Sequence, residues 1–186
     1  ILIEGSKHTL NNMSDTAKTS STKYLRAMGV TVITEVLMTN YDGKTAKLDN
    51  GKEIKTGTVI WAAGVTGNKI EGLPETSITR GNRIIVDRYN RVNGCDAIYA
   101  IGDIAYMETP KYPKGHPQLA NVAINQAKCL AKNLKAIQLN NKLTEFEYKD
   151  LGSMATIGNH KAVVDLPFIK FEGYFAWLTW MFLHLM

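Results

Sequence analysis

The sequence has few cysteines. Its two, Cys95 and Cys129, lie far apart, without a C-x-x-C motif or a Cys/His spacing typical of a metal site. The four histidines are also isolated from one another along the chain. These absences exclude a disulfide framework, a metal centre of cysteine and histidine, and a paired-cysteine redox centre. They favour free thiols in a reducing compartment.

The sequence also lacks a block of basic residues. Lys and Arg number 22 against 17 Asp and Glu, a net charge of +5, and they are spread along the chain. Nucleic-acid binding is therefore not expected, because proteins that bind nucleic acid gather their basic residues in one stretch or on one face. The mild positive charge suits an acidic partner such as a dinucleotide or an anionic membrane surface.

Both ends of the sequence lack the usual marks of a complete protein. It begins with Ile1 rather than methionine, and it ends in an apolar stretch over 174–186 without a polar tail. We expect an internal or C-terminal piece of a longer polypeptide. The 186 residues, 45% of them hydrophobic, are enough for one good core or two small ones.

The first third of the sequence predicts a nucleotide-binding pattern followed by a meander. Ser14 suits the N-cap of a helix over 14–28 that Gly29 stops, and strands over 1–3 and 30–33 flank this helix. Together they form the second half of a βαβαβ unit. Turn residues around Asp42-Gly43 and Asn50-Gly51 then predict a small antiparallel meander with strands over 36–41, 45–48 and 53–56.

The remaining sequence alternates strands with one long helix. We predict a crossover between two subdomains over 65–81 and a helix over 120–139. Further strands are predicted over 58–61, 83–86 and 97–103, with a terminal hairpin over 148–157 and 162–166. The expected fold class is α/β. It is an incomplete pair of Rossmann-like dinucleotide-binding domains in three layers, with a mostly parallel sheet and the small meander.

The most informative motif is Gly102-Asp103, at the end of the apolar run 97–101. Open α/β sheets bind ligands at the carboxyl ends of their strands. Gly102 would let a ligand approach the backbone, and the Asp103 carboxylate could accept hydrogen bonds from sugar or ribityl hydroxyls. The alternative is a simple turn in which Asp103 caps the next helix.

Two other strand ends carry candidate binding residues. Glu4 ends the first strand, where an acidic residue commonly binds adenosine ribose hydroxyls, or it is only a surface glutamate. The glycine fingerprint expected upstream of it would fall before Ile1. Ala62, Ala63 and Gly64 follow the predicted strand 58–61 with almost no side chain. They could let a planar cofactor lie against the backbone, or simply allow close helix–sheet packing.

The long helix and the aromatic end also offer candidates. Free N–H groups at the helix N-terminus could meet a flavin carbonyl or pyrophosphate, and Asn121 and Asn125 share one face that could meet a quinone-like carbonyl. The alternative leaves Asn125 and Gln126 merely solvated. The apolar stretch 175–186 is shorter than the ~18–20 residues that a membrane span needs. Its tryptophans suit a membrane interface, and a core or dimer helix is the alternative.

Taken in order, these motifs resemble the type II NADH:quinone oxidoreductases, single-subunit flavoproteins with two dinucleotide-binding domains. The resemblance runs through essentially the whole chain but covers only the latter part of a family member. It rests on five strings, ILIEG at 1–5, VIWAAGV at 59–65, IYAIGDIA at 98–105, PQLANVAINQA at 117–127 and GSMATIG at 152–158.

The resemblance implies a role for each motif. Glu4 resembles the NADH ribose ligand, Ala63 and Gly64 part of the NADH-side wall, and Gly102 and Asp103 the second FAD-binding motif. The helix residues Asn121 and Val122 resemble further cofactor contacts.

Asn121 and Asn125 fall on two positions that are glutamine in the family, beside the flavin and the quinone. Both are one methylene shorter here, so water or the neighbouring Gln126 is expected to complete the quinone contact. The family needs no catalytic side chain and no metal.

The resemblance also divides the chain and implies its setting. Residues 1–70 would be the latter part of the NADH-binding domain, and 71–150 the latter part of the FAD-binding domain. Residues 151–186 would form the terminal hairpin and the start of a membrane-anchoring region. The expected enzyme is an FAD-dependent NADH dehydrogenase that serves respiratory electron transfer. It would reduce a membrane quinone at the cytoplasmic face of the cell inner membrane, as a peripheral protein for which a homodimer is one candidate assembly.

Two alternatives stay open. One is a soluble ferredoxin- or rubredoxin-reductase-like flavoenzyme. The other is an inert fragment, because neither glycine-rich phosphate-binding loop lies within this sequence.

Overall fold

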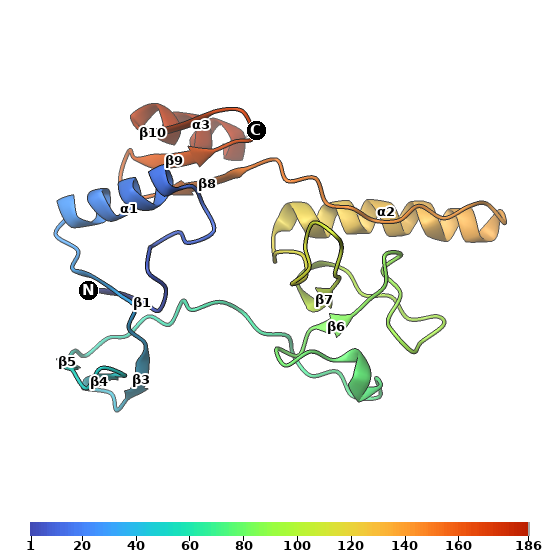
Figure 1. The fold of residues 1–186 in the computed structure, drawn as a ribbon, viewed down its shortest axis with the longest axis horizontal. Coiled ribbons are helices and arrows are strands. Elements are labelled where there is room, and N and C mark those ends of the chain that lie inside the picture. Colours follow the sequence, from blue (N-terminus) through green and yellow to red (C-terminus); the bar gives the residue numbers. More distant parts are fainter. Residues whose placement is uncertain (186) are drawn as a thin grey trace. The chain divides into compact units, whose positions relative to one another are not determined.

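The computed structural model describes residues 1–185 and divides them into two compact units (Figure 1). The first unit joins Ile1–Trp61 to the segment that begins at Asp150, and the second unit is Ala62–Lys149. The second unit is therefore continuous in sequence, whereas the first is assembled from two distant stretches.

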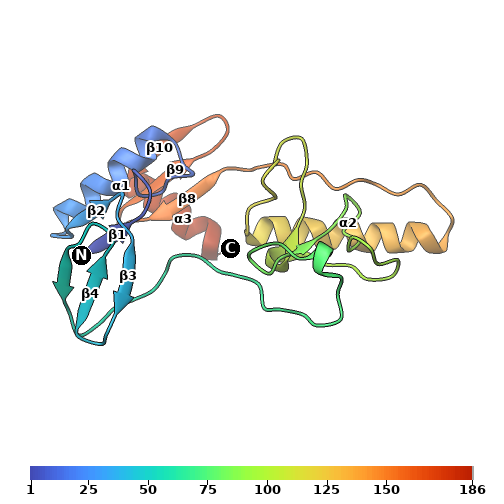
Figure 2. The same ribbon diagram turned by 60° about the horizontal axis from the view of Figure 1, so that its bottom comes forward.

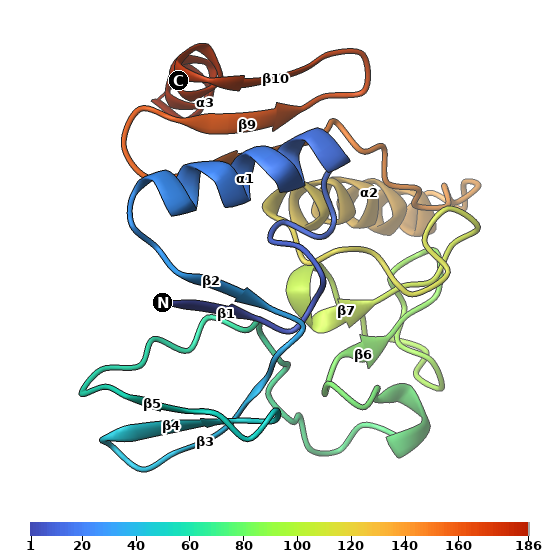
Figure 3. The same cartoon turned by 60° about the vertical axis from the view of Figure 1, so that its left-hand side comes forward.

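The first unit opens with the predicted βαβ element. Strands β1 (Leu2–Glu4) and β2 (Val32–Thr34) pair in parallel, and helix α1 (Asp15–Ala27) connects them (Figure 3). Ser14 caps α1, because its Oγ accepts a hydrogen bond from the Ala17 N–H at 3.4 Å. Gly29, at φ +79°, ends the turn that follows the helix. The predicted helix is confirmed to within one residue at each end, whereas both strands lie slightly later than the predicted ranges 1–3 and 30–33.

The predicted meander is also confirmed. Strands β3 (Met38–Tyr41), β4 (Thr45–Leu48) and β5 (Glu53–Lys55) form an antiparallel sheet, in which Figure 2 shows the strands side by side. The Asp42 carboxylate accepts hydrogen bonds from the Lys44 and Thr45 N–H groups at 2.9 and 2.7 Å. Asp42 therefore holds the first turn closed, as its position before a glycine predicts.

A three-layer sandwich completes the first unit. Strands β8 (Ser153–Thr156), β9 (Ala162–Asp165) and β10 (Lys170–Gly173) form a second antiparallel sheet. Helices α1 and α3 (Tyr174–Leu185) both pack on this sheet (Figure 1). In β9, Val163 joins the core with α1, while Val164 joins the core with α3, so the two helices cover opposite faces.

The sandwich extends the sequence prediction in two ways. Strand β10 lies beyond the hairpin predicted over 148–166. Asp165 of β9 also accepts hydrogen bonds from the Ser14 N–H and from the Ser14 hydroxyl, the latter at 2.6 Å. The N-terminus of α1 is therefore fastened to a strand 151 positions later in the chain.

The second unit is built around short elements and one long helix. The short strands β6 (Ile84–Ile85) and β7 (Ala105–Tyr106) pair in parallel. The 3₁₀ helices η1 (Glu75–Ser77) and η2 (Gly102–Ile104) lie in the connections, and α2 (Ala120–Gln138) is the long helix.

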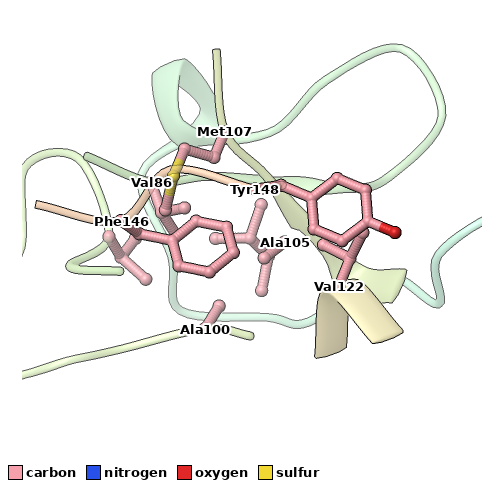
Figure 4. Packing of buried hydrophobic residues seen from close by; sticks show 9 residues of the cluster. Val86, Ala100, Ala105, Met107, Val122, Phe146 and Tyr148 are labelled. Carbon is pink, nitrogen blue, oxygen red and sulfur yellow. The ribbon is translucent and has the colours of Figure 1, made fainter. Parts of the chain in front are cut away.

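The core of the second unit brings residues from the whole segment together. Figure 4 shows Val122 of α2 packed with Val86, Ala100, Ala105, Met107, Phe146 and Tyr148. Phe146 and Tyr148 come from the extended segment that follows α2. This segment is fastened by Asn133 of α2, whose amide exchanges two hydrogen bonds with the backbone of Thr144 at 2.8 and 2.9 Å.

The α/β class is confirmed, but the strand pairing differs from a mostly parallel sheet. Among the described residues only β1–β2 and β6–β7 pair in parallel. The segments 58–61 and 97–103 were predicted as strands, yet 58–61 is irregular, and 97–103 makes only an isolated bridge at Tyr99 before it enters η2 at Gly102. Ile60 is 86% exposed. The physical reason is that an apolar segment becomes a strand only where a neighbouring strand completes its hydrogen bonds.

Candidate functional site

The Gly102-Asp103 turn lies against the first turns of α2. Gly102 has φ +72°, a left-handed conformation that glycine adopts without strain. A Cβ added to Gly102 would lie 3.3 Å from the Cβ of Ala123. The turn and the helix therefore approach each other closely, and glycine suits this position on both counts.

The backbone of this turn is held from both sides. The Gly102 N–H donates to Oε1 of Gln126 at 2.7 Å, and Gln126 is only 1% exposed. The Asp103 carbonyl accepts from Nε of Arg83 at 3.1 Å and from Nε2 of Gln118 at 3.2 Å. Arg83 also donates to the carbonyls of Ala105 and His116. Burial lowers the pKa of Arg83 from its ordinary value, which is far too high for this to change its charge at neutral pH.

The Asp103 side chain itself is exposed. It lies inside η2, whose N-cap is Ile101, so Asp103 does not cap the long helix as the alternative interpretation requires. An exposed carboxylate on a fixed backbone is a suitable acceptor for a ligand hydroxyl.

The N-terminus of α2 presents free donors at the same place. Leu119 occupies the N-cap position, and no side chain of the described residues caps the helix there. The first N–H groups of a helix have no intrahelical acceptor, so those at Asn121 and Val122 lack a partner within α2. Val122 is only 3% exposed as a whole residue and lies in the core, so Asn121 is the more accessible of the two.

The two asparagines differ in what they can offer. Both are exposed, as expected for one face of the helix. Nδ2 of Asn125 donates to the Asn121 carbonyl at 2.7 Å, so its donor group is engaged by its own helix. The neighbouring Gln126, which one interpretation left solvated, is instead buried and bound to Gly102.

Glu4 belongs to the first unit, and the other predicted site residues belong to the second. Oε1 of Glu4 accepts from the Ser6 N–H at 2.7 Å, so the end of β1 folds back on the carboxylate. Ala63 and Gly64 are exposed and lie in irregular backbone, where Gly64 has φ +99°. Glu4 and Asp103 thus belong to different units.

His116, which directly precedes the Pro117 of the helix motif, was missed as a site residue because it is isolated in sequence. Its ring is 2% exposed and lies 4.8 Å from the ring of Tyr112, 5.3 Å from Phe146 and 6.4 Å from Tyr148. Neither ring nitrogen finds a hydrogen-bond partner within residues 1–185. Burial is the largest cause that lowers the pKa of His116.

The residues present fit a flavin dinucleotide better than a metal. An exposed carboxylate, a closely approached glycine and an uncapped helix N-terminus supply acceptors and donors for hydroxyls and carbonyls. No group of three or more His, Cys, Asp or Glu side chains suited to a metal occurs in the described part of the chain. Cys95 and Cys129 are free thiols.

Comparison with known proteins points to one family. The model of the pyridine nucleotide-disulphide oxidoreductase family matches residues 1–127. The type II NADH:quinone oxidoreductase NdhA of Mycobacterium tuberculosis is 32% identical over 198 aligned positions, covering 100% of this chain and 41% of that protein. The type II NADH:quinone oxidoreductase of Staphylococcus aureus is 30% identical and covers 87% of this chain and 40% of its own length.

Solved structures share the fold. NDH2 from Plasmodium falciparum, solved in complex with NADH, aligns with a TM-score of 0.86 at 20% identity, covering 98% of this chain and 53% of that one. A ferredoxin reductase from Rhodopseudomonas palustris aligns with a TM-score of 0.62 at 16% identity, covering 87% of this chain and 46% of that one. The chain thus spans about two-fifths of the length of the curated relatives and about half of these solved chains.

Proposed function

The chain belongs to the pyridine nucleotide-disulphide oxidoreductase family, and from this we propose that it forms part of a type II NADH:quinone oxidoreductase. The bound groups supply the chemistry, which is hydride transfer from NADH to FAD and then transfer of two electrons to a quinone. The residues of this chain bind and orient those groups. No nucleophile or general base is needed among them.

The observation that carries this proposal is the meeting of the Gly102-Asp103 turn with the uncapped start of α2. The Asp103 carboxylate would accept a hydrogen bond from a ribityl hydroxyl of FAD. The N–H groups at Asn121 and Val122 would face a flavin carbonyl, with the positive end of the helix dipole behind them. The absence of a Cβ at Gly102 lets the turn lie close against Ala123 of α2.

Two further contacts belong to the same proposal. Glu4 would bind the ribose hydroxyls of NADH, supported by its position at the end of β1 in a βαβ element. Ala63 and Gly64 would form part of the NADH-side wall. On the quinone side, Asn121 is the better candidate, because the donor group of Asn125 is engaged by its own helix.

The proposed division of the chain follows these contacts. Residues 1–70 would serve NADH and residues 71–150 FAD, whereas the segment 151–186 would begin the membrane-anchoring region. No helix among residues 1–185 is long and apolar enough to cross a bilayer.

Attachment of the last segment to a membrane surface is supported by its exposed aromatic side chains, and the cytoplasmic face of the inner membrane is the side that the resemblance implies. Phe168 is 100% exposed and Phe175 is 75% exposed. A homodimer could cover the same side chains.

The deciding assay is NADH oxidation by membranes from cells that produce the protein, measured with and without added quinone. We expect oxidation that depends on quinone. Reduction of a soluble ferredoxin without any quinone reduction would instead favour the ferredoxin-reductase-like alternative and overturn the proposal.

A matched pair of variants of the protein used in the membrane assay tests the flavin site. Asp103→Asn keeps the shape of the side chain and removes the charged acceptor, so we expect flavin retention to weaken by roughly tenfold. Asp96→Asn makes the same change at another exposed position and should leave flavin retention unchanged. Equal flavin content in the two purified variants would refute the role of Asp103.

A further inference from the structure

Gln126 is a buried amide, for which the sequence indicated only a substitute role at the quinone contact or a solvated position. It is 1% exposed, although it lies between the exposed residues Asn125 and Ala127 on α2. Burial of a side-chain amide is costly unless it is hydrogen-bonded. Its Oε1 atom accepts a 2.7 Å hydrogen bond from the backbone of Gly102, far away in sequence.

This bond serves a backbone donor that lacks a local acceptor. Gly102 is the first residue of η2, and the preceding residue, Ile101, provides no side-chain cap. The first N–H groups of a short helix find no acceptor within it. Gln126 therefore acts as a cap supplied from another element.

The same face of α2 makes the second contact with the turn. Ala123 lies three residues before Gln126, on the same side of the helix. The Cβ of Ala123 would lie only 3.3 Å from a Cβ added at Gly102, so a larger residue than glycine would crowd it. Ala123 thus sets how closely the turn can approach, and Gln126 holds it at that approach.

Neighbouring amides do not duplicate this contact. Asn125 points to a different face and donates to the Asn121 carbonyl of its own helix. Gln118 reaches the turn, but it donates to the Asp103 carbonyl rather than accepting from Gly102. Among the side chains of residues 1–185, only that of Gln126 accepts the Gly102 N–H.

We propose that Gln126 is a positioning residue that fixes the Gly102-Asp103 turn against the start of α2. The inference that Gln126 positions a flavin site rests on the proposed function, whereas its contact with Gly102 does not. By holding the backbone from the interior, Gln126 leaves the Asp103 carboxylate and the helix N-terminus both facing a ligand.

The experiment is amide hydrogen exchange, followed by NMR on the 186-residue chain without added cofactor. Gln126→Met keeps the length of the side chain and removes its acceptor, and we expect exchange at Gly102 to accelerate on the order of tenfold. Asn125→Met places the same residue at the adjacent exposed position and should leave Gly102 unaffected. Exchange at Val92 and His116, whose N–H groups bond elsewhere in the second unit, should not change in either variant.

A second variant keeps the test decisive if Gln126→Met does not fold. Gln126→Glu retains an acceptor oxygen at the same distance from the helix, so protection of Gly102 should be restored. Unchanged exchange at Gly102 in Gln126→Met, or equal acceleration in Asn125→Met, would overturn the proposal. So would a folded Gln126→Glu that leaves Gly102 unprotected. Since no flavin or quinone takes part, failure of the membrane assay would leave this result intact.

Discussion

Replacing His116 by phenylalanine should stabilise the protein, and more so in acid. The neutral ring carries one donor and one acceptor, and neither finds a partner among the described residues. A buried group left unsatisfied costs about 1–3 kcal/mol. Phenylalanine keeps a ring against Tyr112, Phe146 and Tyr148 without this cost, but its larger ring offsets part of the gain. We expect the free energy of unfolding to rise by about 1 kcal/mol near neutral pH.

The pH dependence follows from the lowered pKa of His116. Burial disfavours the protonated ring, and Arg88 and Arg83 act in the same direction, whereas Glu147 and the nearby backbone of Met107 oppose them. The unfolded chain therefore binds a proton that the folded chain resists. His116 therefore leaves the free energy of unfolding unaffected well above about pH 6.5, the ordinary histidine pKa. Below this pH the free energy of unfolding falls by at most about 1.4 kcal/mol per pH unit. His116→Phe removes this loss, so its advantage should grow toward about pH 5.

The assay is urea unfolding at about pH 7.5 and about pH 5, since the two conditions lie on either side of the ordinary histidine pKa. NMR signals of the second unit should be followed, because all three tryptophans lie in the first. His8→Phe, at an exposed position, is the matched control and should change little. This account of His116 would be refuted if the His116→Phe variant were less stable than the original chain at both pH values and its free energy of unfolding depended on pH in the same way.

Three further predictions concern other contacts. Ser14→Ala removes the helix cap that also binds Asp165 and should lower the free energy of unfolding by about 1 kcal/mol. An unchanged midpoint of thermal or urea unfolding would contradict this prediction. Asn133→Leu leaves the backbone of Thr144 without two hydrogen-bond partners, so it should lower the free energy of unfolding by about 2 kcal/mol and speed amide exchange at Thr144. Unchanged exchange at Thr144 would argue against this contact. Phe175→Ser should reduce co-sedimentation with anionic lipid vesicles severalfold, and undiminished binding would exclude this side chain as a membrane contact.

Local signals in the sequence predicted the local parts of the fold well. Helix α1 was predicted because Ser14 and Gly29 mark its ends, and the meander because Asp42-Gly43 and Asn50-Gly51 form turns. These features depend only on neighbouring residues. The apolar run 58–61 failed as a strand because its conformation depends on a partner that local sequence does not specify.

The candidate site shows the same division between local and distant effects. Helical spacing correctly placed Asn121 and Asn125 on one exposed face. It could not show that Gln126 would be buried, because that depends on where Gly102 lies in space. His116 escaped notice because Phe146 and Tyr148, which enclose it, come from beyond the long helix.

The bond between Ser14 and Asp165 has a consequence for how the chain is made. During synthesis, α1 leaves the ribosome before the strand that completes its cap, which lies 151 positions later in the chain. The second unit, Ala62–Lys149, is continuous in sequence, so it can fold before the last segment of the first unit has been synthesised. Prior folding of this insert would shorten the effective loop that must close, which lowers the entropic cost of joining the two stretches of the first unit. The order of synthesis thus favours folding from the middle of the chain outward.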